Sequence, residues 1–448
     1  GIGTFVNNGS YLRQGSGTTR AARFENFGLL HVQDGTFQME GDGRLSGRTV
    51  VDRGTTLAFY ASGANITGVI DNAGLVTVDG AGVLLAAGSS LNGHVKLLSS
   101  SLSHQSNHTF AKLEMAGGQL TGTGHVTVQS LDFQAGLLGG AISGTYVTGS
   151  TTVLGASTFN GSKNQGISAN HTLTLRGDST WTAGSGGITG AIFSGVVVNA
   201  NGATFTDQGA GTANDSKQLS DYSGSFINEG TYVRSGLGTT IVHNVDNRGL
   251  MQIDTGRLQT GTAFTNTGTI RVSDDAVLQS AFGNAGTIEG TGTVDTGTRT
   301  LTNGGTLDPG LAGTLGRLTV LGNLQMTDQG ILSITLGSGG QSDLLMITDE
   351  VLWAGELQVS ALPGLTLQLG DMYTIARYGE RLSDSTFSSI RWQGLGAPRF
   401  TVNYTADAIT LQVAAVPEPA TWALLLAGGG VLVWTARRRT HAGFNRAP

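Results

Sequence analysis

The side chains best suited to metal binding in this sequence are two of its 8 histidines. His104 and His108 have the i, i+4 spacing with which a helix presents a pair of metal ligands. The residues around them, Ser100-Ser-Leu-Ser-His-Gln-Ser-Asn, indicate a loop or a strand instead. A strand would place both histidines on one face but ~13 Å apart. We therefore expect solvated loop histidines and no metal site.

Catalytic chemistry finds little support in the remaining polar residues. Two isolated pairs of acids, Asp274-Asp275 and Asp349-Glu350, are expected in turns. A catalytic role for such a carboxylate pair is an alternative that no other feature of the sequence supports. The chain has no cysteine, which excludes disulfides, thiolate nucleophiles and cysteine-based metal sites. We expect no catalytic residue, no cofactor and no enzymatic activity.

Composition limits the partners as well. The formal net charge is −6, charged residues make up 12% of the chain against a typical ~25%, and no basic stripe precedes the extreme C-terminus. Nucleic acid is therefore not an expected partner. Apolar residues reach 38%, which is enough to bury a core, and the 72 glycines are roughly twice the usual share.

One short pattern recurs along the chain: an apolar residue, any residue, Asn, any residue, Gly, and then alternating apolar positions. Within each cluster the asparagines are about 19 residues apart, and a period near 20 indicates a stacked solenoid. Residues 3–39 also align without gaps on residues 224–260, which indicates an internal duplication. The predicted corner residues are Asn7, Gly9, Asn26, Gly28, Asn228, Gly230, Asn247, Gly249, Asn266, Gly268, Asn284 and Gly286.

Short alternating runs such as Leu29-Leu-His-Val32 and Thr269-Ile-Arg-Val272 have the strand period of two. Asn and Gly tolerate the left-handed conformation of a tight bend, and asparagines at one place in successive coils could form a hydrogen-bonded ladder. The fold class is therefore predicted to be all-β, a right-handed parallel β-helix. A second corner pattern, Gly41-Asp-Gly43 and its repeats, lacks the further glycine and the helix of a phosphate-binding loop.

From about residue 305 the apolar strands become longer, after the turn Asp308-Pro309-Gly310. Gly316-Arg-Leu-Thr-Val-Leu-Gly-Asn-Leu324 and Ser342-Asp-Leu344 follow, and this arrangement resembles the C-terminal part of autotransporter-type passenger domains. A solenoid needs a cap because its last coil otherwise exposes an open β edge. We interpret residues 305–415 as that cap.

The C-terminus consists of three consecutive parts. Pro417, Glu418 and Pro419 precede an apolar run over 420–434, which is slightly shorter than the ~20 residues of a spanning helix. Arg437, Arg438 and Arg439 follow and predict a cytoplasmic end. From these residues alone, the apolar run can also be interpreted as a plain membrane anchor or as a buried core helix.

The order of these parts resembles the PEP-CTERM sorting signals of Gram-negative bacteria. The resemblance covers about residues 416–440 and implies a single transmembrane helix. It also implies that an exosortase, a membrane protease-transpeptidase, recognises the signal, removes the tail and passes the protein to the envelope or the extracellular matrix. The inner membrane would then hold the chain only transiently.

The predicted organisation is a β-helix repeat region over 1–304, a β-rich cap over 305–415, a sorting and anchor segment over 416–440 and a short tail over 441–448. Because Gly1 already lies within a repeat, we expect a truncated start. The favoured function is a structural or adhesin-like surface rod, with exopolysaccharide or another surface glycan as partner. The alternative is a polysaccharide-active β-helix lyase or hydrolase, which should show acids clustered with Arg or Lys on one face.

Overall fold

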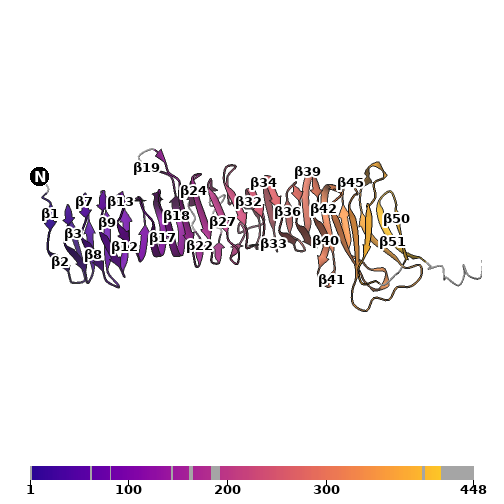
Figure 1. Ribbon diagram of the computed structural model, residues 1–448, viewed down its shortest axis with the longest axis horizontal. Coiled ribbons are helices and arrows are strands. Elements are labelled where there is room, and N and C mark those ends of the chain that lie inside the picture. The colour runs from indigo at the N-terminus through magenta and orange to yellow at the C-terminus, as the bar shows by residue number, and fades with distance from the viewer. Residues whose placement is uncertain are drawn as a thin grey trace, which may run out of the picture.

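The chain forms one long β-solenoid, which the computed structural model describes over residues 3–60, 63–80, 82–142, 145–160, 165–182, 192–395 and 399–414 (Figure 1). About 16 turns stack along the axis of the rod. Within these ranges the only helical segments are two 3₁₀ turns, η1 (Ser338–Gly340) and η2 (Leu382–Asp384). The prediction of an all-β solenoid is confirmed.

Each turn contributes three short strands, which we call its first, second and third positions, and each strand pairs in parallel with its counterparts in the neighbouring turns. The first position holds β1 (Phe5–Asn7), β4 (Phe24–Asn26), β7 (Gly43–Leu45), β10 (Ala64–Ile66), β13 (Val83–Leu85), β16 (Ser101–His104), β23 (Gln165–Ile167), β26 (Ile192–Phe193), β29 (Ser216–Gln218), β36 (Val277–Gln279), β44 (Leu344–Ile347) and β47 (Met372–Arg377).

The second position forms another side of the rod, on which β2, β5, β8, β11 and β14 make a separate five-stranded sheet. It holds β2 (Ser10–Arg13), β5 (Leu29–Val32), β8 (Arg48–Val51), β11 (Val69–Asn72), β14 (Ser90–Leu91), β21 (Gly149–Val153), β24 (His171–Leu175), β27 (Val196–Asn199), β30 (Ser225–Asn228), β37 (Gly283–Asn284), β45 (Glu350–Leu352) and β48 (Glu380–Arg381).

The third position completes the turn. It holds β3 (Thr18–Ala21), β6 (Thr36–Met39), β9 (Thr56–Tyr60), β12 (Leu75–Asp79), β15 (His94–Leu97), β22 (Ser157–Phe159), β25 (Ser179–Trp181), β28 (Thr204–Asp207), β31 (Thr231–Arg234), β33 (Leu250–Ile253), β35 (Thr269–Val272), β38 (Thr287–Gly290), β40 (Thr306–Leu311), β43 (Ile331–Leu336), β46 (Glu356–Ala361) and β49 (Ser389–Trp392).

Six longer strands run through a corner and occupy two or three positions. They are β17 (His108–Gly122), β18 (His125–Leu138), β32 (Thr239–Asn247), β34 (Arg257–Asn266), β39 (Thr293–Asn303) and β42 (Arg317–Met326). Two short antiparallel additions project from the turns: β19 (Ala141–Ile142) pairs with β20 (Thr145–Tyr146), and β41 (Thr314–Leu315) pairs back on β40.

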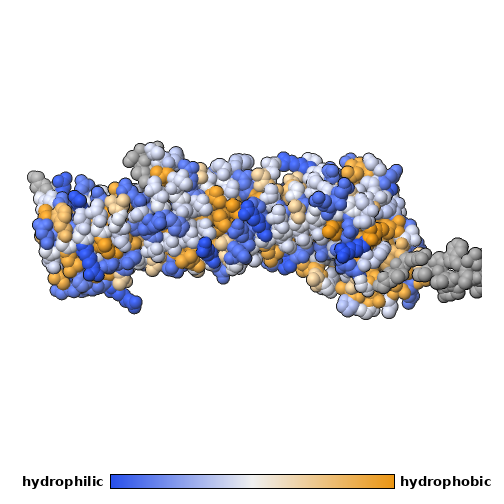
Figure 2. Space-filling view, viewed as in Figure 1, coloured by the Kyte–Doolittle hydropathy of each residue, from blue (hydrophilic) through white to orange (hydrophobic). Residues whose placement is uncertain are grey.

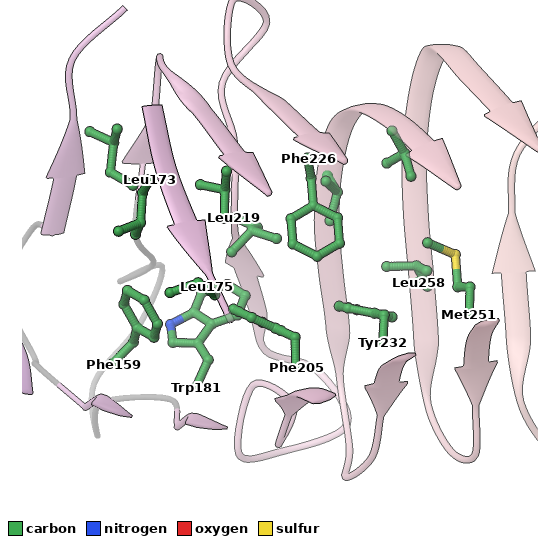
Figure 3. Packing of buried hydrophobic residues seen from close by; sticks show 14 of the residues in the cluster. Phe159, Leu173, Leu175, Trp181, Phe205, Leu219, Phe226, Tyr232, Met251 and Leu258 are labelled. Carbon is green, nitrogen blue, oxygen red and sulfur yellow. The ribbon is translucent and has the colours of Figure 1, made fainter. Parts of the chain in front are cut away.

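The core is a column of inward side chains, one layer per turn. In β5 the alternation of the sequence buries Leu30 and Val32 completely and leaves their neighbours half-exposed. Aromatic rings stack from turn to turn in the same way, and Figure 3 shows Phe205 next to Tyr232, with ring centroids 6.0 Å apart. Each layer therefore buries its apolar surface against the layers beside it.

A second column consists of asparagine side chains. In the second position, the side-chain amide of each asparagine donates to the side-chain carbonyl of the asparagine in the next turn, over 2.6–2.8 Å. This asparagine ladder consists of Asn199, Asn228, Asn247, Asn266, Asn284 and Asn303. A shorter pair, Asn7 and Asn26, makes the same bond at 2.7 Å in the first position.

The asparagine ladder has a direction and two different ends. The preceding residue in the stack is Leu175, which offers no donor, and the Asn199 carbonyl oxygen has no hydrogen-bond partner among the described residues. At the far end the Asn303 amide meets the Met326 sulfur at 3.4 Å. All the amide dipoles in between point the same way, so each bond polarises the next.

The glycines of the Asn-x-Gly corners are required for a different reason from the one expected. None of the six predicted corner glycines has a positive φ, so the left-handed explanation is wrong for them. A Cβ at Gly28 would lie 2.0 Å from the Gly9 carbonyl oxygen, and one at Gly249 would lie 2.1 Å from that of Gly230. Close approach of the backbones of successive turns excludes a side chain at five of the six corner glycines, whereas Gly9, in the first turn, has open space around it.

The duplicated segments do not lie on the same side of the rod. Asn7 is in β1 at the first position, whereas its duplicate Asn228 is in β30 at the second. The repeat has therefore shifted by one strand position between the two halves, which the alignment of the two segments does not reveal.

The last turns close the rod with antiparallel strands. Parallel pairing between turns continues past residue 305 as far as β49 on β46. The chain then forms β50 (Arg399–Tyr404) and β51 (Ala408–Ala414), and β51 lies between β50 and β47. Because β51 has partners on both sides, it leaves no open edge of its own.

Breaking the asparagine ladder in its middle should destabilise the rod. Asn247→Leu removes both ladder bonds of Asn247 as well as its bond to the Thr269 carbonyl. It leaves the Asn228 amide and the Asn266 side-chain carbonyl buried without these partners, at a cost of about 3 kcal/mol in the free energy of unfolding. Asn199→Leu, which extends the apolar stack from Leu175, should cost less. Urea unfolding measures both against the exposed Asn201→Ala, and equal midpoints for Asn247→Leu and Asn201→Ala would contradict the role of the ladder.

Candidate functional site

The histidines singled out in the sequence lie inside the rod. His104 ends β16 and His108 begins β17, and only 1% and 5% of their surfaces are exposed. Their ring centroids are 5.9 Å apart because the chain turns a corner between them. The predictions of solvated loop histidines and of a ~13 Å separation are therefore wrong, since both assumed that no corner intervenes.

A glycine opposite His104 makes room for its ring. His104 pairs with Gly122 in the next turn, where a Cβ would lie 2.5 Å from the imidazole. His171 is likewise buried, with its Nε2 3.0 Å from the Thr151 hydroxyl. Burial lowers the pKa of His104 and of His171 to about 4, so both rings are neutral at pH 7. Nowhere in the described ranges do three or more His, Cys, Asp or Glu residues form a group able to hold a metal ion.

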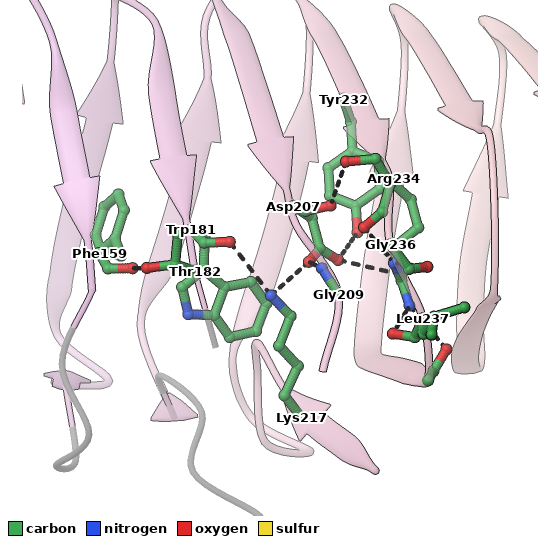
Figure 4. A network of polar contacts seen from close by, with 12 residues as sticks. Phe159, Trp181, Thr182, Asp207, Gly209, Lys217, Tyr232, Arg234, Gly236 and Leu237 are labelled. Atoms are coloured by element: carbon green, nitrogen blue, oxygen red, sulfur yellow. Dashed lines mark hydrogen bonds and ion pairs between the residues drawn. The ribbon is translucent and has the colours of Figure 1, made fainter. Parts of the chain in front are cut away.

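A group of charged side chains lies in the core near residue 210 (Figure 4). Asp207, at the end of β28, faces Lys217 of β29 with Oδ1 2.5 Å from Nζ, and both side chains are closed to solvent. The Tyr232 hydroxyl donates to Asp207 Oδ2 over 2.8 Å, and Arg234 Nε lies 3.6 Å from the same oxygen. We call these four residues the buried charge cluster.

The loop after Arg234 takes up the rest of its guanidinium. Its two Nη atoms donate to four backbone carbonyls, those of Ser235, Gly236, Leu237 and Gly238, over 2.7–3.0 Å. The duplicated Arg13 likewise donates to the carbonyls of Gln14, Gly15 and Gly17. An arginine followed by a glycine-rich loop is therefore a repeated way to bury a cation in this fold.

Electrostatics keep Asp207 ionised although it is buried. Burial alone would raise its pKa, but the ammonium of Lys217 and the guanidinium of Arg234 outweigh that effect and hold the pKa below its usual value. Burial also lowers the pKa of Lys217, and the Asp207 carboxylate opposes that shift. The Lys217 ammonium also lies 3.6 Å from the centroid of the Trp181 ring.

The alternation of inward and outward positions in the strands is a signal for this cluster within the sequence. In the alternating run Thr204-Phe-Thr-Asp207, the aspartate has the same parity as the inward Phe205. Arg234 likewise has the parity of the buried Tyr232. A charged residue at an inward position needs a partner from another turn, and the structure supplies one. Acid and base thus do meet, but in the core, where no substrate can reach them.

The predicted sorting residues cannot be placed in the same way. Pro417, Glu418, Pro419, Arg437, Arg438 and Arg439 and the predicted transmembrane helix lie outside the described residues. Within the described part of the chain, no helix has the length and apolarity required to cross a bilayer.

Comparison with known families identifies this end of the chain. The family model for the PEP-CTERM protein-sorting motif matches residues 415–439, directly after β51 ends at Ala414. The curated proteins contain no match to the chain. The chain thus carries a PEP-CTERM sorting motif, which indicates export, anchoring in the membrane at the C-terminus, processing by an exosortase and arrival at the cell surface.

Neutralising the acid of the buried charge cluster should be costly. Asp207→Asn leaves the Lys217 and Arg234 cations in the core without their anion, and we expect a loss of roughly 3–5 kcal/mol in the free energy of unfolding. The double variant Asp207→Asn/Lys217→Met removes one of the two cations and should recover part of that loss. Urea unfolding measures both; an Asp207→Asn midpoint equal to wild type would show that the pair is open to water.

Proposed function

We propose that this protein is a non-enzymatic surface rod with a structural or adhesive role in the bacterial envelope or extracellular matrix. The sorting motif would serve as a removable address, and the solenoid would be the part that reaches the surface. We also propose that residues 420–434 form the membrane-spanning helix of the unprocessed chain. The solenoid should wind right-handed, as parallel crossover connections do.

The position of the motif relative to the fold supports this division of roles. The pairing of β50 with β51 runs through Arg399 and Ala414, and the matched motif begins at the next residue. Removal of the tail after about Pro419 would therefore break none of the backbone pairings between these strands. The rod would keep its fold after processing.

An adhesive role is supported by an exposed aromatic side chain on the flank of the rod. Tyr222 is 85% exposed, and its ring centroid lies 4.0 Å from that of His243 in the next turn. Asn244 fixes the loop by donating to the carbonyls of Tyr222 and Gly224 over 2.9 and 2.8 Å. A rigid, exposed ring of this kind can stack against the C–H face of a sugar, so we propose a surface glycan or exopolysaccharide as its ligand.

The alternative, a polysaccharide lyase or hydrolase, is favoured by one observation. Burial raises the pKa of Asp308 and of Asp343 to about 6, as a general acid requires. Asp343, however, is 1% exposed, and its two oxygens accept the backbone amides of Gly316 and Thr335 over 2.8 and 2.7 Å. A carboxylate that joins the residue before β42 to β43 in this way has a structural role, so we place the enzyme second.

Processing is tested by the intact mass of the protein in the native cell. The mature chain should lack the residues after about Pro419 and should fractionate with the envelope or the matrix. Glu418→Ala should leave a larger share of unprocessed chain in the inner membrane, because the motif presented to the exosortase is altered. Glu350→Ala on the rod is the control, and a wild-type chain that keeps its tail would refute the sorting role.

Adhesion and catalysis are separated by one polysaccharide panel. We expect the purified protein to bind at least one surface polysaccharide without shortening it, and Tyr222→Ala to weaken that binding about tenfold, which corresponds to ~1.4 kcal/mol. Tyr60→Ala, at another exposed tyrosine, should bind as wild type does. Turnover of any polysaccharide would favour the enzyme.

A further inference from the structure

The place where the tail leaves the rod is bound directly to one loop. Val413, next to the end of β51, donates its amide to the Asp371 carbonyl and accepts the amide of Gly370, both over 2.9 Å. Met372 then begins β47, which pairs antiparallel with β51. The loop before β47 and the start of the tail are therefore held together.

This loop has an unusual composition for an exposed segment. Residues 362–370 read Leu-Pro-Gly-Leu-Thr-Leu-Gln-Leu-Gly, with five apolar side chains and no charge. Leu369 is 71% exposed and Met372 is 55% exposed. We call residues 362–370, together with Met372 and Leu395, the cap patch.

The cap patch surrounds an open hollow. Its volume is about 500 Å³, and Leu362, Pro363, Leu365, Leu367 and Leu395 contribute to its lining. Figure 2 shows hydrophobic residues at the end of the rod that the last turns form. Leu365, Leu367 and Leu395 pack against the core, whereas Leu369 and Met372 stay exposed. Exposed apolar side chains gathered in this way mark a contact with a partner or with a membrane.

The tail limits what that contact can be. Five residues lie between Ala414 and Ala420, where the apolar run of the tail begins, so the two can be at most about 20 Å apart. While the tail is anchored, the cap patch is thus within reach of the bilayer surface. An uncharged leucine-rich loop is suited to the apolar side of that interface.

We propose that the cap patch rests on the lipid bilayer while the tail is anchored, and that this contact orients the rod before processing. The inference rests on the proposed sorting role, since it requires an inserted tail. It adds a second attachment point beside the tail, which would hold the Pro417-Glu418-Pro419 segment at a fixed height. Once the tail is removed, the contact is too small to retain the rod.

The absence of cysteine allows a direct test on the full chain. Leu369→Cys carries an environment-sensitive fluorophore, and the chain is reconstituted into phosphatidylethanolamine–phosphatidylglycerol vesicles that contain nitroxide-labelled lipid. Leu237→Cys is the matched control, since Leu237 is 55% exposed and lies several turns along the rod. We expect a blue shift and strong quenching at position 369 and neither at position 237.

The outcomes separate this inference from the function on which it rests. Carbonate extraction first establishes whether the tail is inserted. An inserted chain without quenching at position 369 overturns the lipid contact alone, and quenching that requires added exosortase overturns it in favour of a protein partner. A chain that carbonate releases overturns both proposals. Leu369→Asp should also lower the processed fraction in cells, whereas Leu237→Asp should not.

Discussion

The backbone of each turn is satisfied by the turns on either side of it, and the rest of this rod follows from that pairing. Parallel pairing in register places each side chain directly beside its counterpart one turn away. The inward side chains of successive turns therefore form columns. The side chains of a column must be apolar, as at Leu30, or must hydrogen-bond to one another from turn to turn, as at Asn247. The same closeness removes the space for a Cβ at the corners, which is why Gly28 and Gly249 are glycines.

Charges enter this core only where the columns can neutralise them. The carboxylate of Asp207 has two cations and a hydroxyl around it, and the Arg234 guanidinium is further enclosed by the carbonyls of its own loop. His104 and His171 are accommodated differently, because burial keeps both rings neutral and each lies opposite a glycine, Gly122 or Gly149. The polar groups inside the rod are thus part of its packing, which leaves recognition to the outer surface and to the tail.

Local patterns were sufficient to predict the solenoid, because the period of two in the strands and the Asn-x-Gly spacing are both properties of neighbouring residues. The sorting tail was also predicted from the order of neighbouring residues. The sequence was insufficient wherever the answer depended on which turn lies next to which. His104 and His108 are close only because a corner separates them, and Asp207 meets Arg234 only across a turn. The parity of Asp207 within its strand already indicated an inward side chain, but its partners required the register.

The shift of the duplicated segment by one strand position has a consequence for valency. The copy at residues 3–39 and the copy at residues 224–260 present equivalent residues on adjacent sides of the rod, not along one line. Two equivalent contacts on a single line would reinforce each other on one straight polymer strand. On adjacent sides they point in different directions, so two equivalent sites on these copies would face two separate strands and would not add their affinities on one.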